Sequence, residues 1–154
     1  MALSVIGIDF YSAKPEVRAR FHLSAKQIDY LYQWMHEPMI ILSTCNRTEI
    51  YSDCPQQDPE VFLGDLLRRI FPGQRITFDD FYFYQDCAAV RHLLELATGL
   101  RSMLLGETEI KGQIEKAVQT ACERVGDLRE LGQIFRSALG FAKEIRNRSK
   151  LGEH

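Results

Sequence analysis

Apolar side chains gather in four short stretches of the chain, and these stretches predict four β-strands. They cover residues 3–9, 39–44, 47–52 and 81–84 and are rich in β-branched and aromatic side chains. Only Cys45 and Asn46 separate the second stretch from the third, so we expect an antiparallel hairpin or a sharp bend there. Asn46 suits such a turn because asparagine tolerates the left-handed backbone conformation.

Between the strands, apolar residues recur at the spacing of an α-helix. Ser24 begins one helix with a capping-box pattern, and Glu37-Pro38 ends it. Asp58-Pro59 begins another, with Asp as N-cap and Pro at the first helical position, and Pro72-Gly73 ends it. Residues 11–20 are interpreted as a polar connection.

The resulting order of elements is βαββαβ over residues 1–85. This is the order of the ferredoxin-like sandwich, an α+β fold whose antiparallel sheet carries both helices on one face. From Asp86 the pattern is helical, with breaks at Gly99 and at Gly126-Asp127. The last helix stays amphipathic to about Ile145 and is expected to end in the basic run that follows.

Composition excludes several classes of protein. The 154 residues fit one soluble globular domain, and a net charge of −2 gives no general attraction to nucleic acid. No apolar run is long enough to span a membrane, and the N-terminus has no signal-peptide pattern, so we expect a cytoplasmic protein. The sequence also has no zinc-binding spacing, no phosphate-binding loop and no dinucleotide fingerprint.

Cys45 stands out because it lies in a polar turn with an arginine two residues away. A thiol beside a cation at a strand end is suited to be a thiolate nucleophile that accepts an acyl group. The same position is equally compatible with a thiol packed under the turn. Arg47 is the natural partner for a carboxylate or phosphate, although it also fits a solvated surface arginine. The other cysteines, Cys54, Cys87 and Cys122, are interpreted as inert thiols.

Two further features carry candidate chemistry. His92 lies in a helical pattern, where it is either a structural histidine or a group that activates the thiol. The loop at residues 99–107 precedes a helix start, which is a ready site for an anion. This loop is equally well explained as a capped connection between helices.

Two long motifs closely resemble glutamyl-tRNA reductase. They are Leu42-Ser-Thr-Cys-Asn-Arg-Thr-Glu-Ile-Tyr51 and the segment from His92 through Ser102, Gly106-Glu107 and Gln113. The resemblance runs from about residue 3 to residue 148. It implies NADPH-dependent reduction of glutamyl-tRNA to glutamate-1-semialdehyde through a thioester on Cys45, the first step of five-carbon tetrapyrrole biosynthesis.

The resemblance also implies site residues, domains and partners. Cys45 and His92 would be catalytic, and the substrate would be bound by Thr44, Asn46, Arg47, Ser102, Glu107, Thr108, Glu109 and Gln113. Residues 1–85 would form the core that carries the nucleophile, residues 86–127 the helical part of the same domain, and residues 128–154 the start of a long connecting helix. The NADPH-binding and dimerisation domains would lie outside this chain. The expected partners are glutamyl-tRNA, a second copy of the full-length protein and glutamate-1-semialdehyde aminomutase.

The sequence departs from the family pattern at several places. Arg101 stands where the family usually has an acidic residue, Thr108-Glu109 where it prefers Pro-Gln, and Glu115 where it is usually basic. These changes bear on substrate affinity more than on the thiol. An alternative reading is a stand-alone tRNA- or regulator-binding module without chemistry, which the basic C-terminal run favours.

Overall fold

Four antiparallel strands form the sheet that positions the candidate site. The computed structural model describes residues 3–35, 37–53, 57–100 and 109–152. The strands are β1 (Leu3–Asp9), β2 (Met39–Ser43), β3 (Arg47–Asp53) and β4 (Tyr82–Gln85). They lie in the order β2-β3-β1-β4, and each neighbouring pair is antiparallel. The α+β class and the four predicted strands are therefore confirmed, with ends shifted by one residue.

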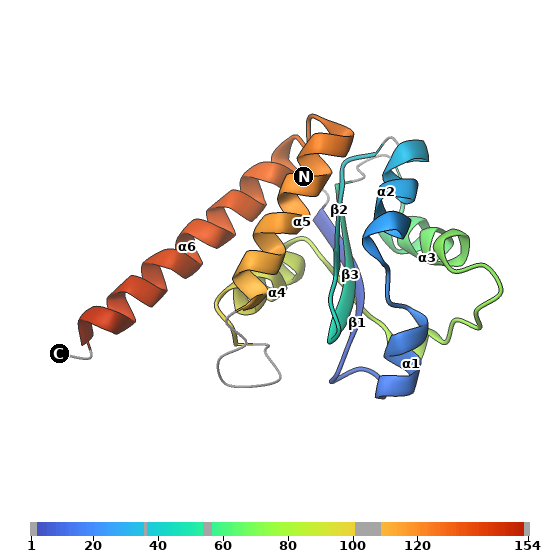
Figure 1. Ribbon diagram of the computed structural model, residues 1–154, viewed down its shortest axis with the longest axis horizontal. Helices are drawn as coiled ribbons and strands as arrows, with labels where there is room; N and C mark the ends of the chain where they lie inside the picture. The colour runs from blue at the N-terminus through green and yellow to red at the C-terminus, as the bar shows by residue number, and fades with distance from the viewer. Residues whose placement is uncertain (1–2, 36, 54–56, 101–108, 153–154) are drawn as a thin grey trace.

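Helices cover both faces of the sheet. One face carries α1 (Pro15–Arg20), α2 (Ala25–Trp34) and α3 (Pro59–Ile70), as Figure 1 shows. The opposite face carries α4 (Cys87–Ala97), α5 (Glu109–Val125) and α6 (Glu130–Gly152), and α6 projects beyond the body of the domain. A short 3₁₀ helix, η1 (Phe78–Asp80), precedes β4.

One prediction about the helices was wrong. The segment interpreted as a polar connection contains α1, which begins at Pro15 and buries none of its residues. With no buried stripe, its six residues give no amphipathic signal to read in the sequence. The last helix, α6, continues through the basic run to Gly152. An ion pair between Glu144 and Arg148, one turn apart at 2.7 Å, supports this extension.

Local side-chain chemistry explains where α2 begins and why the outer edge of β2 is not exposed. Ser24 accepts a hydrogen bond from the Gln27 backbone N–H, and the Gln27 side chain accepts one from the Ser24 N–H, which is the predicted capping box. The Tyr32 hydroxyl then bridges the edge of β2: it donates to Met39 O at 3.1 Å and accepts from Ile41 N–H at 3.0 Å. Burial raises the pKa of this Tyr32 hydroxyl well above its ordinary value, so it stays a donor.

Gly7, in the middle of β1, allows the side chain of Tyr82 from β4 to lie across β1. Gly7 pairs with Tyr82 on one side and with Glu49 on the other. A Cβ atom at Gly7 would lie 2.6 Å from the Tyr82 ring and hydroxyl, so the ring passes directly over the glycine. The Tyr82 hydroxyl thereby reaches Glu49 at 2.6 Å. Glycine is required here by space rather than by backbone conformation.

We expect Gly7→Ala to lower the free energy of unfolding by about 1–3 kcal/mol, because the Tyr82 ring must move off its position. Urea unfolding of the two proteins measures this difference. Gly140→Ala is the matched control: its added Cβ meets no atom within 4 Å in the middle of α6, and alanine should stabilise that helix by up to about 1 kcal/mol. If Gly7→Ala lowered the free energy of unfolding by only a few tenths of a kcal/mol, the position of the Tyr82 ring over Gly7 would be contradicted.

None of the helices in the described part of the chain combines the length and the apolar character needed to cross a membrane.

Candidate functional site

The hairpin between β2 and β3 displays the thiol of Cys45. Thr44 N–H donates to Arg47 O at 2.8 Å, which closes the turn, and Asn46 N–H donates to Thr44 Oγ1 at 3.1 Å. Cys45 is exposed at the tip, whereas Thr44 and Arg47 on either side are buried. The predicted left-handed conformation of Asn46 was wrong, because the non-glycine residues with positive φ in the described ranges are Asp86 and Arg129.

A cavity of about 310 Å³ opens beside the thiol. Its lining includes Cys45 and Arg47 from the hairpin and Arg18 and His22 from the segment after β1. The remaining lining residues are Ile8, Ala19, Thr44 and Thr48. The cavity therefore brings a potential nucleophile together with two guanidinium groups and an imidazole.

His22 is tied to the turn that carries Cys45. Its Nδ1 lies 3.2 Å from Thr44 O and 3.4 Å from Ser43 Oγ. A backbone carbonyl only accepts, so the contact with Thr44 requires a proton on Nδ1, and in the neutral ring Nε2 is then the basic nitrogen. Ser43 is itself held by Leu23 N–H at 2.9 Å and by the Thr48 hydroxyl at 2.9 Å.

Arg18, the other cationic side chain of this cavity, has no acidic partner among the described residues. Its Nη1 donates to Ala13 O at 3.2 Å, and its Nε is buried without a hydrogen-bond partner in the described part of the protein. A buried donor without an acceptor is costly. Arg18 is therefore suited to hold a carboxylate that enters the cavity.

Arg47 is arranged differently. Its side chain is 0% exposed, and its Nη1 lies 3.7 Å from Asp9 Oδ2. Asp9 is fixed in turn, because its Oδ1 accepts from the backbone N–H groups of Tyr11 and Ser12 at 2.9 and 3.0 Å. Arg47 thus shares its charge with a buried carboxylate, and the residue forms part of the cavity wall.

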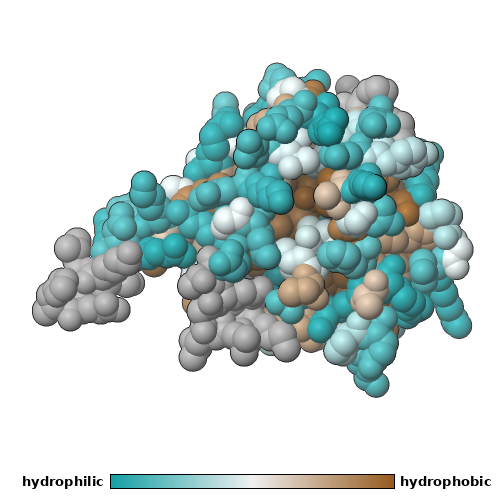
Figure 2. All heavy atoms as spheres, in the orientation of Figure 1, coloured by the Kyte–Doolittle hydropathy of each residue, from teal (hydrophilic) through white to brown (hydrophobic). Residues whose placement is uncertain are grey.

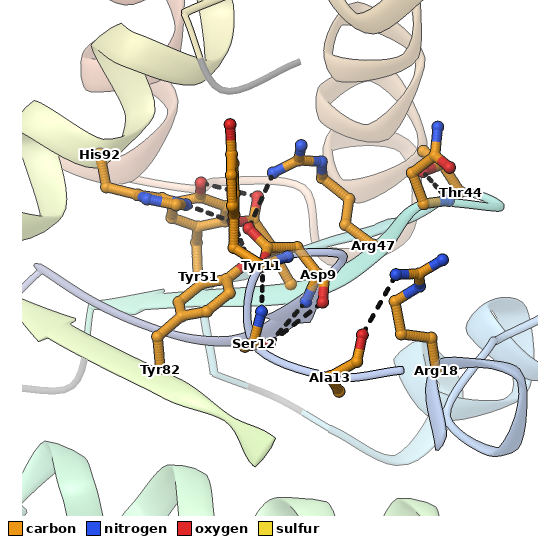
Figure 3. A network of polar contacts seen from close by, with 12 residues as sticks. Asp9, Tyr11, Ser12, Ala13, Arg18, Thr44, Arg47, Tyr51, Tyr82 and His92 are labelled. Carbon is orange, nitrogen blue, oxygen red and sulfur yellow. Dashed lines mark hydrogen bonds and ion pairs between the residues drawn. The ribbon is translucent and has the colours of Figure 1, made fainter. Parts of the chain in front are cut away.

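A second buried carboxylate, Glu49, lies next along this face of the sheet. It accepts hydrogen bonds from the hydroxyls of Tyr51 at 3.0 Å and Tyr82 at 2.6 Å, and it contacts His92 Nε2. The His92 ring also lies 5.1 Å from the rings of both Tyr82 and Tyr84. Figure 3 shows Tyr51, Tyr82 and His92 within a network of polar contacts that also includes Asp9 and Arg47, with His92 at the left of the view and Thr44 at the right.

The network determines the ionisation of its members. Burial raises the pKa of Glu49, but the hydrogen bond and charge of His92, the charge of Arg47 and the Tyr82 hydroxyl together lower it below the ordinary value. Burial, followed by the charges of Glu49 and Asp9, raises the pKa of Tyr82 well above its ordinary value. Glu49 is therefore a carboxylate and Tyr82 a neutral donor over the physiological range.

The lowered pKa of Glu49 predicts a loss of stability in acid. A group whose pKa is lower in the folded protein stabilises the fold above its unfolded value, near 4.5, and this contribution is lost as the pH falls through the folded value. We expect the difference in unfolding free energy between the wild type and Glu49→Gln to be constant from pH 7 to 5 and to shrink below about pH 4.5. Urea unfolding across this range measures it. A difference that stays constant down to pH 3.5 would contradict the assigned charge.

The structure brings together part of the predicted site. Thr44, Cys45, Asn46 and Arg47 form the hairpin turn. His92 is 3% exposed, does not line the thiol cavity and interacts with Glu49 instead. Glu109 is exposed at the start of α5, and Gln113 lines a separate cavity. Ser102, Glu107 and Thr108 lie outside the described residues, as does Arg101.

Sequence reasoning missed the residues that surround the predicted ones. Arg18 and His22 gave no signal, because they meet Cys45 across more than 20 positions of the chain and belong to no spacing pattern. Asp9 and Glu49 offered a weak signal, because each is an acidic residue that lies in a strand beside buried residues. Within the described ranges, no cluster of three or more His, Cys, Asp or Glu side chains is arranged to hold a metal ion.

These features define a class: an antiparallel α+β domain that displays a cysteine on a hairpin turn, beside a cavity with cationic side chains. The family model of the glutamyl-tRNAGlu reductase N-terminal domain matches residues 6–149. The chain therefore belongs to the glutamyl-tRNA reductase N-terminal domain family.

Individual relatives agree with this assignment. Over its whole length the chain is 35% identical to glutamyl-tRNA reductase of Albidiferax ferrireducens and 33% identical to that of Halorhodospira halophila. It spans 38% and 35% of those proteins. The solved structure of glutamyl-tRNA reductase from Methanopyrus kandleri superposes with a TM-score of 0.73 at 30% identity, covering 95% of this chain and 34% of that one.

Proposed function

We propose that this domain takes the glutamyl group from glutamyl-tRNA onto Cys45, the first half of the reaction catalysed by glutamyl-tRNA reductase. The observation that carries the proposal is the exposed thiol at the hairpin turn, beside a cavity lined by Arg18, His22 and Arg47. This cavity brings together a nucleophile, a basic nitrogen and cationic residues. The relatives are named glutamyl-tRNA reductases, so we take the glutamyl group as the acyl group that is transferred.

The proposed step is a transfer of an acyl group from oxygen to sulfur. The Cys45 sulfur attacks the ester carbonyl carbon, and the carbonyl electrons move to oxygen to give a tetrahedral oxyanion. The oxyanion collapses, the bond between carbon and the ribose oxygen breaks, and a thioester remains on Cys45. The thiol proton ends on the ribose hydroxyl of the released tRNA, and His22, the histidine that lines the cavity, is proposed to carry it through Nε2.

Two arginines are placed to hold the side-chain carboxylate of the glutamyl group. Arg47, the residue implied by the family motif, is restrained by Asp9 and forms part of the cavity wall. Arg18 offers a donor that has no partner in the described structure. We propose that both contribute, because a planar guanidinium binds a carboxylate through paired hydrogen bonds. The other residues that the family resemblance implies remain predicted binding residues: Thr44, Asn46, Ser102, Glu107, Thr108, Glu109 and Gln113.

We propose that His92 is a positioning residue, which acts on the hairpin through Glu49 and does not contact the thiol. His92 contacts Glu49. Glu49 and Arg47 lie two residues apart on β3, and their charges interact. A change at His92 would therefore reach the hairpin through Glu49 and Arg47.

The described residues do not fit NADPH. A dinucleotide site uses a parallel βαβ unit with a glycine-rich turn, whereas every strand pair described here is antiparallel. NADPH, bound by another part of the protein, would supply the hydride that converts the thioester into the aldehyde.

We also propose the finer description of the domain. The strand order β2-β3-β1-β4 supports a ferredoxin-like arrangement for residues 1–85, with residues 86–127 as the helical part and residues 128–154 as a connecting helix. A cytoplasmic location, a homodimer of the full-length protein and contact with glutamate-1-semialdehyde aminomutase remain predictions.

Intact-mass measurement after incubation with glutamyl-tRNA tests the proposed function. We expect a mass increase of one glutamyl group on the wild type and none on Cys45→Ser. Uncharged tRNA is the control and should leave the mass unchanged. An unmodified wild type, or an adduct that persists in Cys45→Ser, would contradict the proposal.

A binding module without chemistry is the second candidate, favoured by the basic side chains near the end of α6, Lys143, Arg146 and Arg148. Binding of uncharged tRNA that is unaffected by both Cys45→Ser and Arg47→Ala would support it.

A further inference from the structure

The outer face of α3 carries exposed apolar side chains next to one another. Val61 on this helix is 59% exposed, and Phe78 of η1 is 47% exposed. Both line a groove of about 240 Å³, in which the Phe78 ring lies over Gly64: a Cβ atom at Gly64 would be 3.5 Å from the ring. Single exposed apolar residues are common, but two that share one groove form a candidate contact surface.

This groove lies apart from the thiol and from the helices at the C-terminal end of the chain. Figure 1 shows α3 on the side of the sheet opposite to α4, α5 and α6. The face of the molecule in Figure 2 is mostly hydrophilic, and the projecting part of α6 is largely teal. The groove on α3 is therefore a separate surface, which the proposed acyl transfer does not use.

The charges along α3 are divided by sign. Asp58 and Glu60 lie at its N-terminal end, and Arg68 and Arg69 lie in its last turn. Between them, Asp65 pairs with Arg68 at 3.1 Å on the open surface, where both side chains are more than half exposed. If a second α3 ran antiparallel to the first, the basic end of each helix would meet the acidic end of the other. The helix is thus complementary in charge to an antiparallel copy of itself.

We propose that the outer face of α3 binds the same face of a second copy of this chain, with the two helices antiparallel about a twofold axis near Gly64. A twofold interface has to be self-complementary, and the charges of α3 meet this requirement. With the axis near Gly64, Glu60 of one copy faces Arg68 of the other, and Val61 of each copy packs towards the groove of its partner.

Two local features make this pairing feasible. The ion pair between Asp65 and Arg68 is exposed and contributes little to stability, so Arg68 can exchange partners at low cost. The guanidinium carbon of Arg68 also lies 5.3 Å from the centre of the Phe78 ring, which keeps this cation at the groove. The apolar and charged contacts of the interface therefore come from one continuous surface.

The proposed contact is small, since each copy contributes one helix and η1, and small interfaces associate weakly. It is also distinct from the dimerisation domain, which the family resemblance places outside this chain. The α3 surface would thus be a second interface of the protein.

Sedimentation velocity of the 154-residue chain over a range of concentrations tests for association. We expect a reversible dimer with a dissociation constant between about 10 μM and 1 mM, and a shift towards monomer as salt is added. NMR chemical shifts should change on dilution at α3 and η1 and not at α6. A chain that stays monomeric at about 1 mM, or shifts confined to other helices, would overturn the proposal.

A mixing experiment tests the antiparallel arrangement. Glu60→Arg and Arg68→Glu, each alone, should raise the dissociation constant at least about tenfold, because both ends of the interface then bring like charges together. An equimolar mixture of the two variants should dimerise about as tightly as the wild type, since each cation again meets an acid. Damage to the fold could not be repaired by mixing.

Lys143→Glu is the matched control for these charge reversals, because Lys143 is exposed on α6, away from the groove. It should leave the dissociation constant unchanged. If Glu60→Arg and Arg68→Glu dimerised as the wild type does, or if their mixture associated no better than either variant alone, the antiparallel α3 interface would be wrong.

Discussion

Cys45→Ser is expected to slow the loss of the ester of glutamyl-tRNA in the presence of this domain by at least about 10³-fold, to the uncatalysed rate. A serine hydroxyl ionises far less readily than a thiol, and the thiolate is the form that attacks. The rate is measured under single-turnover conditions, as the loss of labelled glutamate from the RNA after the protein has been removed by phenol extraction.

The control for this experiment is Cys87→Ser. Cys87 is also exposed, but it begins α4 and does not line the thiol cavity. Its replacement should leave the rate unchanged. Equal loss of activity in both variants would indicate general damage to the fold rather than removal of a nucleophile.

Glu49→Leu is expected to lower the free energy of unfolding by about 3–5 kcal/mol, because it removes one partner of a buried charged pair. The two tyrosine hydroxyls and His92 lose their common acceptor, and Arg47 loses a nearby negative charge. Chemical denaturation monitored by circular dichroism measures the change.

Glu115→Leu provides the comparison for Glu49. Its carboxylate is exposed and pairs with Lys111 at 3.5 Å one turn away on α5. Exposed pairs of this kind contribute about 0.5 kcal/mol or less, so the effect should be small. Similar losses at the two positions would contradict the central role of Glu49 in the buried network.

The strands and the long helices could be predicted because each has its own periodic signal. The apolar run before Cys45 and the capping box at Ser24 mark their elements locally, and the structure confirms both. Helix α1 carries no such signal, since none of its residues is buried. The apolar stripe of α6 ends near Ile145, and the ion pair between Glu144 and Arg148 supports the helix beyond it.

The candidate site was only partly predictable for a related reason. The hairpin residues are adjacent in sequence and were found together. The network beneath them joins Glu49 to His92 across 43 positions and to Tyr82 across 33, and no spacing rule links such residues. The need for glycine at position 7 could not be predicted either, because it depends on the Tyr82 ring that lies over this residue. The family motifs gave the nucleophile, whereas Arg18 and His22 required the fold.

The most direct test of the central claim uses a variant that retains Cys45 alone, with Cys54, Cys87 and Cys122 replaced by serine. After reaction with glutamyl-tRNA, the account predicts one glutamyl group per molecule, mapped to Cys45 and released by neutral hydroxylamine as expected for a thioester. An unmodified protein, or an adduct that resists hydroxylamine, would contradict acyl transfer to the thiol.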